Sequence, residues 1–338
     1  MVQAVVDFLE LKKWLQSSSG KHYVLCDENT YQHCYEIFCD QIGYKIKPII
    51  IKAGEAQKEI LTCQFLWQTL IDDQAGKDAV LINLGGGVIS DIGGFVAATY
   101  KRGIKYANVP TSLLAMVDAA SGGKTGINYQ HFKNIIGVIQ PAEMLVIHVP
   151  FLKTLPEQHL KNGFSEMLKH AIISGQQQTT EILESNNLAH FLNKASVLKS
   201  LAIKENIVAQ DPNEQGLRKV LNFGHTIGHG IEYTANLHGF EILHGEAVAL
   251  GLIAALKLSV LKLNFNSNDA DVLIAFIRNN FDTPNWLHVH HADVLSAVLQ
   301  DKKNSEQQIK MVLLKEIGMP VIDVKCSLQE VENILSEI

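Results

Sequence analysis

The sequence lacks the features that mark a membrane protein or a nucleic-acid-binding protein. It contains no stretch of about 18 uninterrupted apolar residues, which is the length that a helix needs to cross a bilayer. Basic residues are few, because 29 Lys and Arg face 35 Asp and Glu and leave a formal net charge of −6. Nucleic-acid binding generally needs a basic face that releases counterions. We therefore expect neither a membrane nor a nucleic acid as a partner, and a phosphorylated ligand would need a local group of Lys and Arg.

Paired cysteines and a secretory leader are also missing. No Cys-x-x-Cys pair occurs among the five cysteines, which are Cys26, Cys34, Cys39, Cys63 and Cys326. An odd number of cysteines without metal-ligand spacing is typical of reduced thiols in the cytoplasm. The first residues have no charged segment ahead of an apolar core, so we expect no signal peptide. These absences favour a cytoplasmic location.

The composition predicts a globular chain, with 47% hydrophobic and 19% charged residues in a length of 338. Up to about residue 150, short β-rich runs alternate with helical patterns such as 57–74, as in a parallel α/β sheet. The strands expected there are 22–27, 47–51, 79–84, 105–110 and 144–149. From about residue 151 the spacing is helical, over 156–174, 178–210, 217–234, 243–262, 267–281 and 291–300.

This change of pattern predicts two domains. We expect an α/β Rossmann-like domain over 1–155 and a mainly α-helical domain over 156–338, with Pro156 suited to begin a helix. A cleft between such domains is a common place for a ligand.

A glycine-rich turn follows the expected strand 79–84. Three glycines at 85–87 precede a helical pattern, where backbone N–H groups could approach a pyrophosphate. Ser90 stands where the third glycine of the strict Gly-x-Gly-x-x-Gly pattern belongs, and a purely structural turn is an equal alternative. Asp91 would suit hydrogen bonds from a ribose or a carboxamide rather than from a phosphate.

The segment 121–126 resembles the end of a phosphate-binding P-loop. Asp118 stands where the first glycine of that motif belongs, so we reject an ATPase. Lys124, together with Lys133 and Asn134, could still contact a phosphate. The alternative is that both lysines are solvated, as most lysines are.

A polar stripe is predicted along a single helix over 218–232. Five polar residues at spacings of 4, 3, 4 and 3 would share its face, and they are Arg218, Asn222, His225, His229 and Glu232. Two histidines four residues apart could share a metal, but a third ligand would have to come from elsewhere because no His-Glu-x-x-His is present. An exposed polar face is the alternative.

Further candidates lie outside this stripe. His244 precedes a helix rich in Ala, Gly and Leu, so it is either a core histidine or a metal ligand. Glu166 and Lys169, three residues apart, would point to one side of a helix, as a surface ion pair or as part of a site. Lys204 falls on the apolar stripe of its helix, so it either extends to solvent or enters a polar site.

With these residues assembled, the chain resembles the 3-dehydroquinate synthases, a family of sugar-phosphate cyclases. The resemblance extends from about Asp27 to the Lys-Lys-Asn ending at 304, and its long segments keep their order: GGGVISD, VPTSLLAMVDAASGGKTGIN, KNIIG, LRKVLNFGHTIGHGIE and LHGEAVALG. It implies an NAD⁺-binding α/β domain, a helical domain for metal and substrate, and a homodimer. The family's common Arg-Glu pair is replaced here by Gln158 and His159.

The resemblance implies three groups of site residues. A divalent metal, zinc or cobalt, would be held by Glu166, His225 and His244, which leaves His229 to contact substrate and Glu232 to orient one of the histidines. Positions that contact the nucleotide are matched by Asp27, Glu55, Lys58, Gly86, Gly87, Asp91, Thr111, Ser112 and Thr154, and Lys133 is grouped with these cofactor-binding residues. Substrate-facing positions are matched by Asp118, Lys124, Asn134, Lys169, Lys204, Arg218, Asn222, His229 and one of Lys302 and Lys303. Arg102 matches an arginine that reaches the phosphate site of the neighbouring subunit.

The implied activity is that of a carbon–oxygen lyase of the shikimate pathway, which supplies aromatic amino acids. Such an enzyme converts 3-deoxy-D-arabino-heptulosonate 7-phosphate to 3-dehydroquinate and phosphate. Its steps are a transient NAD-dependent oxidation, phosphate elimination, re-reduction, ring opening and an intramolecular aldol reaction. Arg218 would pair with the substrate carboxylate in bidentate fashion.

Other functions are open at this point. A related sugar-phosphate cyclase or a metal-dependent polyol dehydrogenase would share the general architecture, although a dehydrogenase has no need for so many cations at its substrate site. A non-catalytic NAD-binding regulator is a further alternative, and it would bind no metal.

Overall fold

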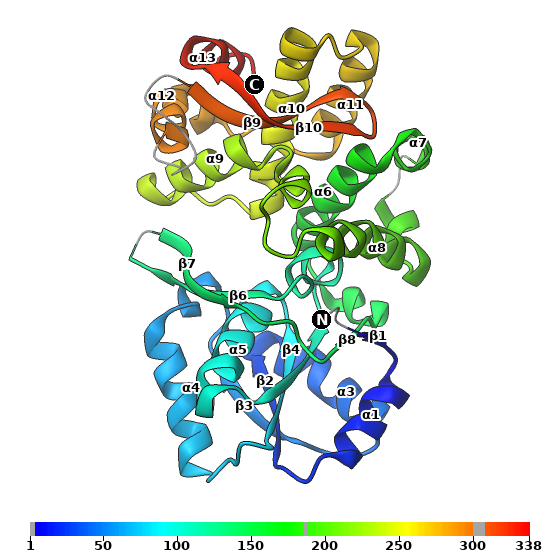
Figure 1. Ribbon diagram of the computed structural model, residues 1–338, viewed down its shortest axis with the longest axis vertical. Coiled ribbons are helices and arrows are strands. Elements are labelled where there is room, and N and C mark those ends of the chain that lie inside the picture. The colour runs from blue at the N-terminus through cyan, green and yellow to red at the C-terminus, as the bar shows by residue number, and fades with distance from the viewer. Residues whose placement is uncertain (1–3, 131, 186–187, 300–307) are drawn as a thin grey trace. The chain divides into compact units, whose positions relative to one another are not determined.

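The computed structural model describes residues 4–130, 132–185, 188–299 and 308–338 (Figure 1). They form two compact units. The first comprises Met1–Pro156 and Leu192–Glu205, and the second comprises Glu157–Phe191 and Asn206–Ile338. The boundary predicted between 155 and 156 would place 192–205 in the second unit, whereas these residues belong to the first unit. Lys302 and Lys303, predicted to supply one substrate contact, lie outside the described residues.

The first unit is built on a parallel sheet of six strands in the order β1-β8-β5-β4-β2-β3. The strand bounds are Ala4–Val6 for β1, His22–Asp27 for β2, Lys47–Ile51 for β3, Val80–Gly85 for β4, Lys105–Pro110 for β5 and Met144–Val146 for β8. Every residue of the central strand β4 is buried, as expected for a parallel strand covered on both faces. The strands predicted from the sequence are confirmed, although β8 is shorter than 144–149, and β1 was not predicted.

Helices and a hairpin complete the first unit. The helices are α1 (Phe8–Ser17), α2 (Glu28–Thr30), α3 (Glu36–Ile42), α4 (Ile60–Asp72) and α5 (Gly87–Thr99). An antiparallel hairpin, β6 (Lys124–Tyr129) with β7 (Phe132–Ile139), was not predicted. Apolar residues of β2, β3 and β4 form one core with those of α4 and α5.

The second unit is mainly helical. Its helices are α6 (Glu157–Ser174), α7 (Gln176–Glu184), α9 (His225–His238), α10 (His244–Leu263), α11 (Ser267–Asn280), α12 (Asn285–Leu299) and α13 (Leu328–Leu335). Helix α8 (Lys194–Gln210) begins in the first unit and ends in the second. Helix α10 is buried along most of its length and packs against α6, α9 and α11. A two-stranded sheet of β9 (Gln308–Glu316) and β10 (Met319–Ser327) was not predicted.

The expectation of one continuous helix over 218–232 is wrong. Leu217–Asn222 form a 3₁₀-helix, and α9 begins only at His225. Between them Gly224 has φ of 80°, and a β-carbon there would lie 2.8 Å from Leu252 Cδ2 on α10. The close approach to α10 therefore requires both a left-handed turn and a residue without a side chain. Arg218 and Asn222 consequently do not lie on the face of α9.

All five cysteines are buried and free. Burial raises the pKa of the Cys26, Cys34 and Cys63 thiols to about 12 and that of Cys326 to about 11. Among the described residues, none of the helices combines the length and the apolar character that a membrane crossing needs.

Candidate functional site

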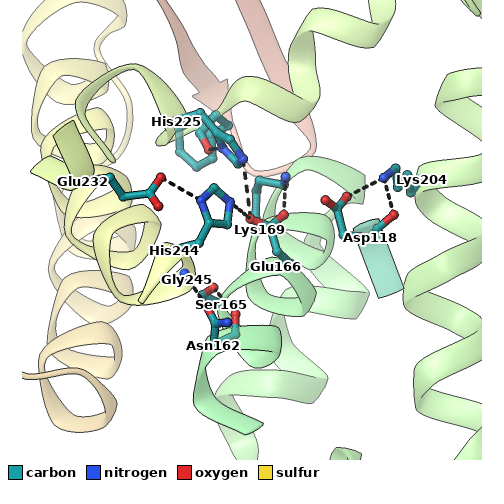
Figure 2. A network of polar contacts seen from close by, with 11 residues as sticks. Asp118, Asn162, Ser165, Glu166, Lys169, Lys204, His225, Glu232, His244 and Gly245 are labelled. Atoms are coloured by element: carbon teal, nitrogen blue, oxygen red, sulfur yellow. Dashed lines mark hydrogen bonds and ion pairs between the residues drawn. The ribbon is translucent and has the colours of Figure 1, made fainter. Parts of the chain in front are cut away.

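Three side chains from three helices of the second unit converge on one point (Figure 2). Glu166 lies within α6, while His225 and His244 are the first residues of α9 and α10. Glu166 Oε1 is 3.5 Å from His225 Nε2 and 3.7 Å from His244 Nε2. One donor atom from each residue lies within 4.8 Å of the other two. One carboxylate and two imidazoles at this spacing form a ligand set that suits zinc or a similar cation.

The other ring nitrogen of each histidine faces an oxygen. His244 Nδ1 lies 2.9 Å from Glu232 Oε2, and His225 Nδ1 lies 3.3 Å from the carbonyl oxygen of Phe223. A carboxylate and a carbonyl can only accept, so in both hydrogen bonds Nδ1 carries the proton. The Nε2 atoms then keep a lone pair on the side of Glu166. Metal-binding histidines are oriented in this way in proteins.

Glu166 itself is fully buried, with 0% of its surface exposed. Lys169 Nζ forms an ion pair with Oε2, whereas Oε1 accepts no hydrogen bond from the described residues. Lys169 is 1% exposed, so both charges are removed from water. A buried carboxylate oxygen without a partner is costly, and Oε1 faces the Nε2 atoms of both histidines. The residues present therefore fit a divalent metal at this position.

Close packing of α6 and α10 brings Glu166 to His244. Gly245 follows His244, and its backbone N–H donates to Asn162 Oδ1 on α6. A β-carbon at Gly245 would lie 2.1 Å from the Asn162 carbonyl oxygen and 2.3 Å from Ser165 Oγ. Only glycine fits between the two helices there. The sequence Leu-His-Gly-Glu therefore combines a candidate metal ligand, His244, with the glycine that allows α10 to approach α6.

His229 lies one turn along α9 from His225, and the ring centroids of the two are 5.3 Å apart. A second possible ligand group is formed by His229, Glu232 and His244. We favour the group with Glu166, because Glu232 already accepts the Nδ1–H of His244 and Glu166 Oε1 accepts no hydrogen bond from the described residues. The side chain of His229 is exposed.

A pocket of the second unit opens beside His225 and His229. Its walls come from the segment 219–229 and from the β9–β10 sheet, and they are Lys219, Asn222, His225, Thr226, His229, Lys310, Met311, Val312 and Asp323. Lys219 Nζ and Asp323 Oδ2 form an ion pair of 2.9 Å across it. The contribution of Lys310 was not predicted, because no strand was expected after residue 151 and Lys310 lies on β9.

Arg218 is placed by the loop before it rather than by a helix face. Asp211 Oδ2 accepts the backbone N–H groups of Gly216 at 2.7 Å and Arg218 at 3.0 Å, while Oδ1 accepts that of Gln215. These bonds, led by that of Gly216, hold the pKa of Asp211 below its ordinary value. Arg218 is 4% exposed and donates from Nη1 to the Pro212 carbonyl at 2.7 Å.

In the first unit, the buried end of Lys204 contacts Asp118 (Figure 2). Lys204 Nζ lies 2.8 Å from Asp118 Oδ1 and donates to the Asp118 carbonyl at 2.6 Å. Lys204 therefore enters a polar site rather than solvent. The next residue, Glu205, accepts from Ser121 Oγ at 3.3 Å, and burial raises the pKa of Glu205. Helix α8 thus binds the turn at 118–121 through two consecutive side chains.

The predicted nucleotide residues gather at one edge of the parallel sheet. Asp27 ends β2, Gly86 follows the end of β4, and Thr111 follows β5, and these three strands are neighbours. Gly86 is the N-cap residue of α5, and no side chain forms a capping hydrogen bond there. A β-carbon on Gly86 would lie 3.3 Å from Ser112 Oγ, so the turn leaves little room for a side chain. The carboxyl edge of parallel strands with an open helix N-terminus is a usual dinucleotide position.

Asn128 links several of the predicted residues but was not itself predicted. Its side chain donates to Glu55 Oε1 at 2.8 Å and accepts the backbone N–H of Asn134 at 2.9 Å, and its backbone N–H donates to the Lys58 carbonyl. Lys58 in turn forms an ion pair with Asp91, whose pKa is raised by burial against the effect of that lysine. The only signal in the sequence was the position of Asn128 at the end of the Lys124 segment.

The remaining predicted residues lie on both units. Lys124, Lys133, Asn134 and Thr154 are exposed in the first unit. Asp27 caps the short helix α2 by accepting the Thr30 N–H at 2.8 Å. Arg102 is exposed after α5 with φ of 60°. In the helical unit, Asn222 donates to Glu214 Oε1 at 2.8 Å, while Gln158 and His159 lie in the first turn of α6.

Two family models match consecutive parts of the sequence. They are the 3-dehydroquinate synthase N-terminal model over residues 48–162 and the C-terminal model over 163–304. The chain is 37% identical to the 3-dehydroquinate synthase of Parabacteroides distasonis over 94% of this chain and 92% of that one. It is 40% identical to the enzyme of that name from Listeria monocytogenes serotype 4a over 92% and 87%.

Solved structures with the same fold include two cyclases. A 2-deoxy-scyllo-inosose synthase complexed with carbaglucose-6-phosphate, NAD⁺ and Co²⁺ superposes with a TM-score of 0.85 at 20% identity, over 99% of this chain and 96% of that one. A 2-epi-5-epi-valiolone synthase from Streptomyces hygroscopicus with NAD⁺ and Zn²⁺ gives 0.83 at 22%, over 100% and 97%. A glycerol dehydrogenase from Schizosaccharomyces pombe gives 0.64 at 15%, over 99% and 88%. At these identities the likeness concerns the fold.

Proposed function

This chain belongs to the 3-dehydroquinate synthase family, and on that premise we propose how its residues carry out the reaction. The substrate is 3-deoxy-D-arabino-heptulosonate 7-phosphate, and the products are 3-dehydroquinate and inorganic phosphate. The enzyme would be a phosphate-eliminating lyase that depends on NAD⁺ and on a divalent metal. The observation that carries this proposal is the convergence of Glu166, His225 and His244 in the unit that also contains Arg218.

Glu166, His225 and His244 would hold the metal, zinc or cobalt. The buried Oε1 of Glu166, which faces both histidines and accepts no hydrogen bond from the described residues, supports this assignment. The carboxyl edge of β2, β4 and β5 would hold the dinucleotide, with its pyrophosphate at the N-terminus of α5. When bound, the metal would polarise the hydroxyl to be oxidised, and NAD⁺ would supply a hydride acceptor that returns the hydride later.

The chain's own cations would bind the anionic substrate. Arg218 suits the carboxylate, because a planar guanidinium can donate two parallel hydrogen bonds. Its position is supported by the Asp211 loop, which fixes the backbone at Arg218. Lys169, Asn222 and His229 would contact hydroxyl or phosphate oxygens, and Asn222 and His229 both line the pocket beside His225. Such fixed charges stabilise developing anions better than water does, since they need no reorientation during reaction.

Residues of the first unit complete the proposed substrate set. They are Asp118, Lys124, Asn134 and Lys204, with Arg102 offered to a second subunit. The ion pair between Lys204 and Asp118 supports a role for both, because it holds the two side chains in a fixed position. Lys133 and Thr154 are proposed to contact the cofactor with Glu55, Lys58 and Asp91.

One assay separates this proposal from the alternatives. The chain, incubated with the heptulosonate phosphate, NAD⁺ and zinc or cobalt, should release phosphate without net formation of NADH. Accumulating NADH would instead indicate a polyol dehydrogenase, and no phosphate above background would contradict the proposal.

A second experiment tests the metal ligands. His244→Ala should lose activity and one bound metal, while His288→Ala, exposed on α12, should keep both. A protein that never binds metal would indicate a non-catalytic regulator.

We also propose that the enzyme acts as a homodimer in the cytoplasm. Strand β7 supports a dimer, because it exposes 48% of Ile135, 40% of Ile136, 37% of Val138 and 58% of Ile139. Exposed branched apolar side chains gathered on one strand are typical of an interface. The free buried thiols are consistent with a reducing compartment.

A further inference from the structure

A second group of possible metal ligands lies at the far end of α9. His238 is the last residue of this helix, and His290 and Asp293 lie on α12. His238 Nε2 is 2.9 Å and His290 Nδ1 is 3.0 Å from the same oxygen, Asp293 Oδ2. The ring centroids of the two histidines are only 4.1 Å apart.

This group is separate from the one around Glu166. Helix α9 has 14 residues, with His225 at its start and His238 at its end. At 1.5 Å per residue these two histidines are about 20 Å apart along the helix. Two cations could therefore bind at the two ends of α9 without sharing a ligand.

The donors and their spacing suit a transition metal. Two imidazole nitrogens and one carboxylate oxygen form a common zinc ligand set, whereas Mg²⁺ and Ca²⁺ prefer oxygen ligands alone. Zinc bonds of about 2.0–2.1 Å in a tetrahedron place neighbouring ligand atoms about 3.3 Å apart. The observed separations of 2.9 and 3.0 Å would need to open by only a few tenths of an ångström. The hydrogen bonds to the histidines lower the pKa of Asp293, so it is ionised, as a ligand must be.

The surroundings orient the two rings and leave access to solvent. His290 interrupts α12 with φ of −109° and ψ of 18°. Phe240 stacks on Trp286 at 5.0 Å and lies 5.5 Å from the ring of His290 and 5.9 Å from that of His238. The side chains of His238, His290 and Asp293 remain 32%, 23% and 45% exposed. A cation can thus enter from solvent, and water can complete its coordination.

We propose that His238, His290 and Asp293 form a second divalent-metal site, selective for zinc-type cations, which joins the end of α9 to α12. Binding replaces the bonds of both histidines to Asp293 with bonds to the metal. Each imidazole then carries its proton on its other nitrogen, so a neutral ring need not release a proton.

The number of zinc ions bound per chain tests this site. Full-length protein, freed of metal by a chelator and washed, is dialysed against zinc and analysed by mass spectrometry for metal content. His290→Ala and Asp293→Asn should each bind one zinc fewer per chain than the natural protein. His288→Ala, an exposed histidine on the same helix, should bind as many as the natural protein. Equal zinc in all four proteins would overturn the proposal.

The comparison does not depend on the metal at Glu166. It uses the difference between two proteins that share an intact Glu166, His225 and His244, so failure of that first site changes both values equally. Folding is checked by circular dichroism, and Asp293→Asn preserves the shape of the side chain if His290→Ala proves unstable. A tenfold excess of Mg²⁺ should leave the difference of one zinc unchanged. Loss of that difference in Mg²⁺ would contradict the zinc-type selectivity.

Discussion

At the scale of single residues, the orientation of His244 depends on Glu232. The carboxylate accepts the Nδ1–H of His244 at 2.9 Å, which fixes the ring and directs Nε2 to the side of Glu166. A negatively charged acceptor also makes the opposite nitrogen a stronger donor to a cation. We therefore propose Glu232 as a positioning residue, which would act on a bound metal through His244.

Glu232→Gln should weaken metal binding without removing it. An amide keeps the shape but lacks the charge, and loss of such a partner typically lowers metal affinity by about 10–100-fold. Zinc titrations of the chelated protein would measure this, and excess zinc should restore activity. If activity stays low at saturating zinc with the melting temperature unchanged, Glu232 does more than position His244.

The candidate residues could be predicted from the sequence to different extents. Local spacing suggested that His225 and His229 share a metal, with Glu166 and His244 as further candidates, and only the family resemblance joined Glu166 and His244 to His225 as one ligand set. Residues that are close in space but 59 and 78 positions from Glu166 in sequence cannot be paired by spacing. Asn128 was missed because its bonds to Glu55 and Asn134 depend on the β6–β7 hairpin.

At the scale of secondary-structure elements, the contact between α6 and α10 depends on Gly245. A β-carbon there would lie 2.1 Å from a backbone oxygen, so one helix would have to shift. We expect Gly245→Ala to destabilise the protein by about 1–3 kcal/mol, as overpacking usually does. It should also weaken metal binding, because His244 moves with α10. Urea unfolding and zinc titration would measure both effects.

A substitution elsewhere on α10 provides the control for this prediction. Leu261 is 57% exposed on the same helix, so Leu261→Ala should leave zinc affinity unchanged. If Gly245→Ala were as stable as Leu261→Ala and bound zinc as tightly, the close contact would not be what positions His244.

The end of α4 is tied to the sheet by Asp73. Its carboxylate accepts from Lys47 Nζ at 2.7 Å and from Tyr23 Oη at 2.7 Å, and these bonds lower its pKa to about 2. Since the folded pKa lies below the ordinary 3.8, the stabilisation is complete above about pH 4 and is lost as the pH falls towards 2.

Asp73→Asn should accordingly flatten the dependence of stability on pH between pH 4 and 2, and it should lower stability at neutral pH. Denaturant unfolding at several pH values would measure the slope. Asp271→Asn, an exposed position on α11, is the control. The same steep slope in Asp73→Asn as in the natural protein would contradict the assignment.

Elements with one strong periodicity were predicted well, and those that depend on distant packing were not. The apolar runs of β2, β4 and β5 read as strands because both faces are buried. The break at Gly224 was missed, since the residues on both sides keep a helical spacing and only contact with Leu252 explains the turn. The β9–β10 sheet was missed because a mainly helical domain was expected over the whole of 156–338.

At the scale of the whole molecule, we expect the exposed apolar side chains of β7 to determine the oligomeric state. Ile139 is 58% exposed, and Ile139→Lys would place a charge in the proposed dimer contact. Light scattering should then give the mass of one chain, where the natural protein gives that of two. Leu237→Lys, 63% exposed on α9, should remain a dimer. A monomeric natural protein, or an unaffected Ile139→Lys, would contradict the proposal.

The buried thiols can report the unfolding of each unit separately. Cys26, Cys34, Cys39 and Cys63 lie in the first unit and Cys326 lies in the second, so any alkylated position identifies which unit has opened. Protonated, enclosed thiols react slowly with alkylating reagents until the surrounding structure unfolds. Brief labelling followed by peptide mapping could therefore time the opening of each half separately, in the unmodified sequence and with no added probe.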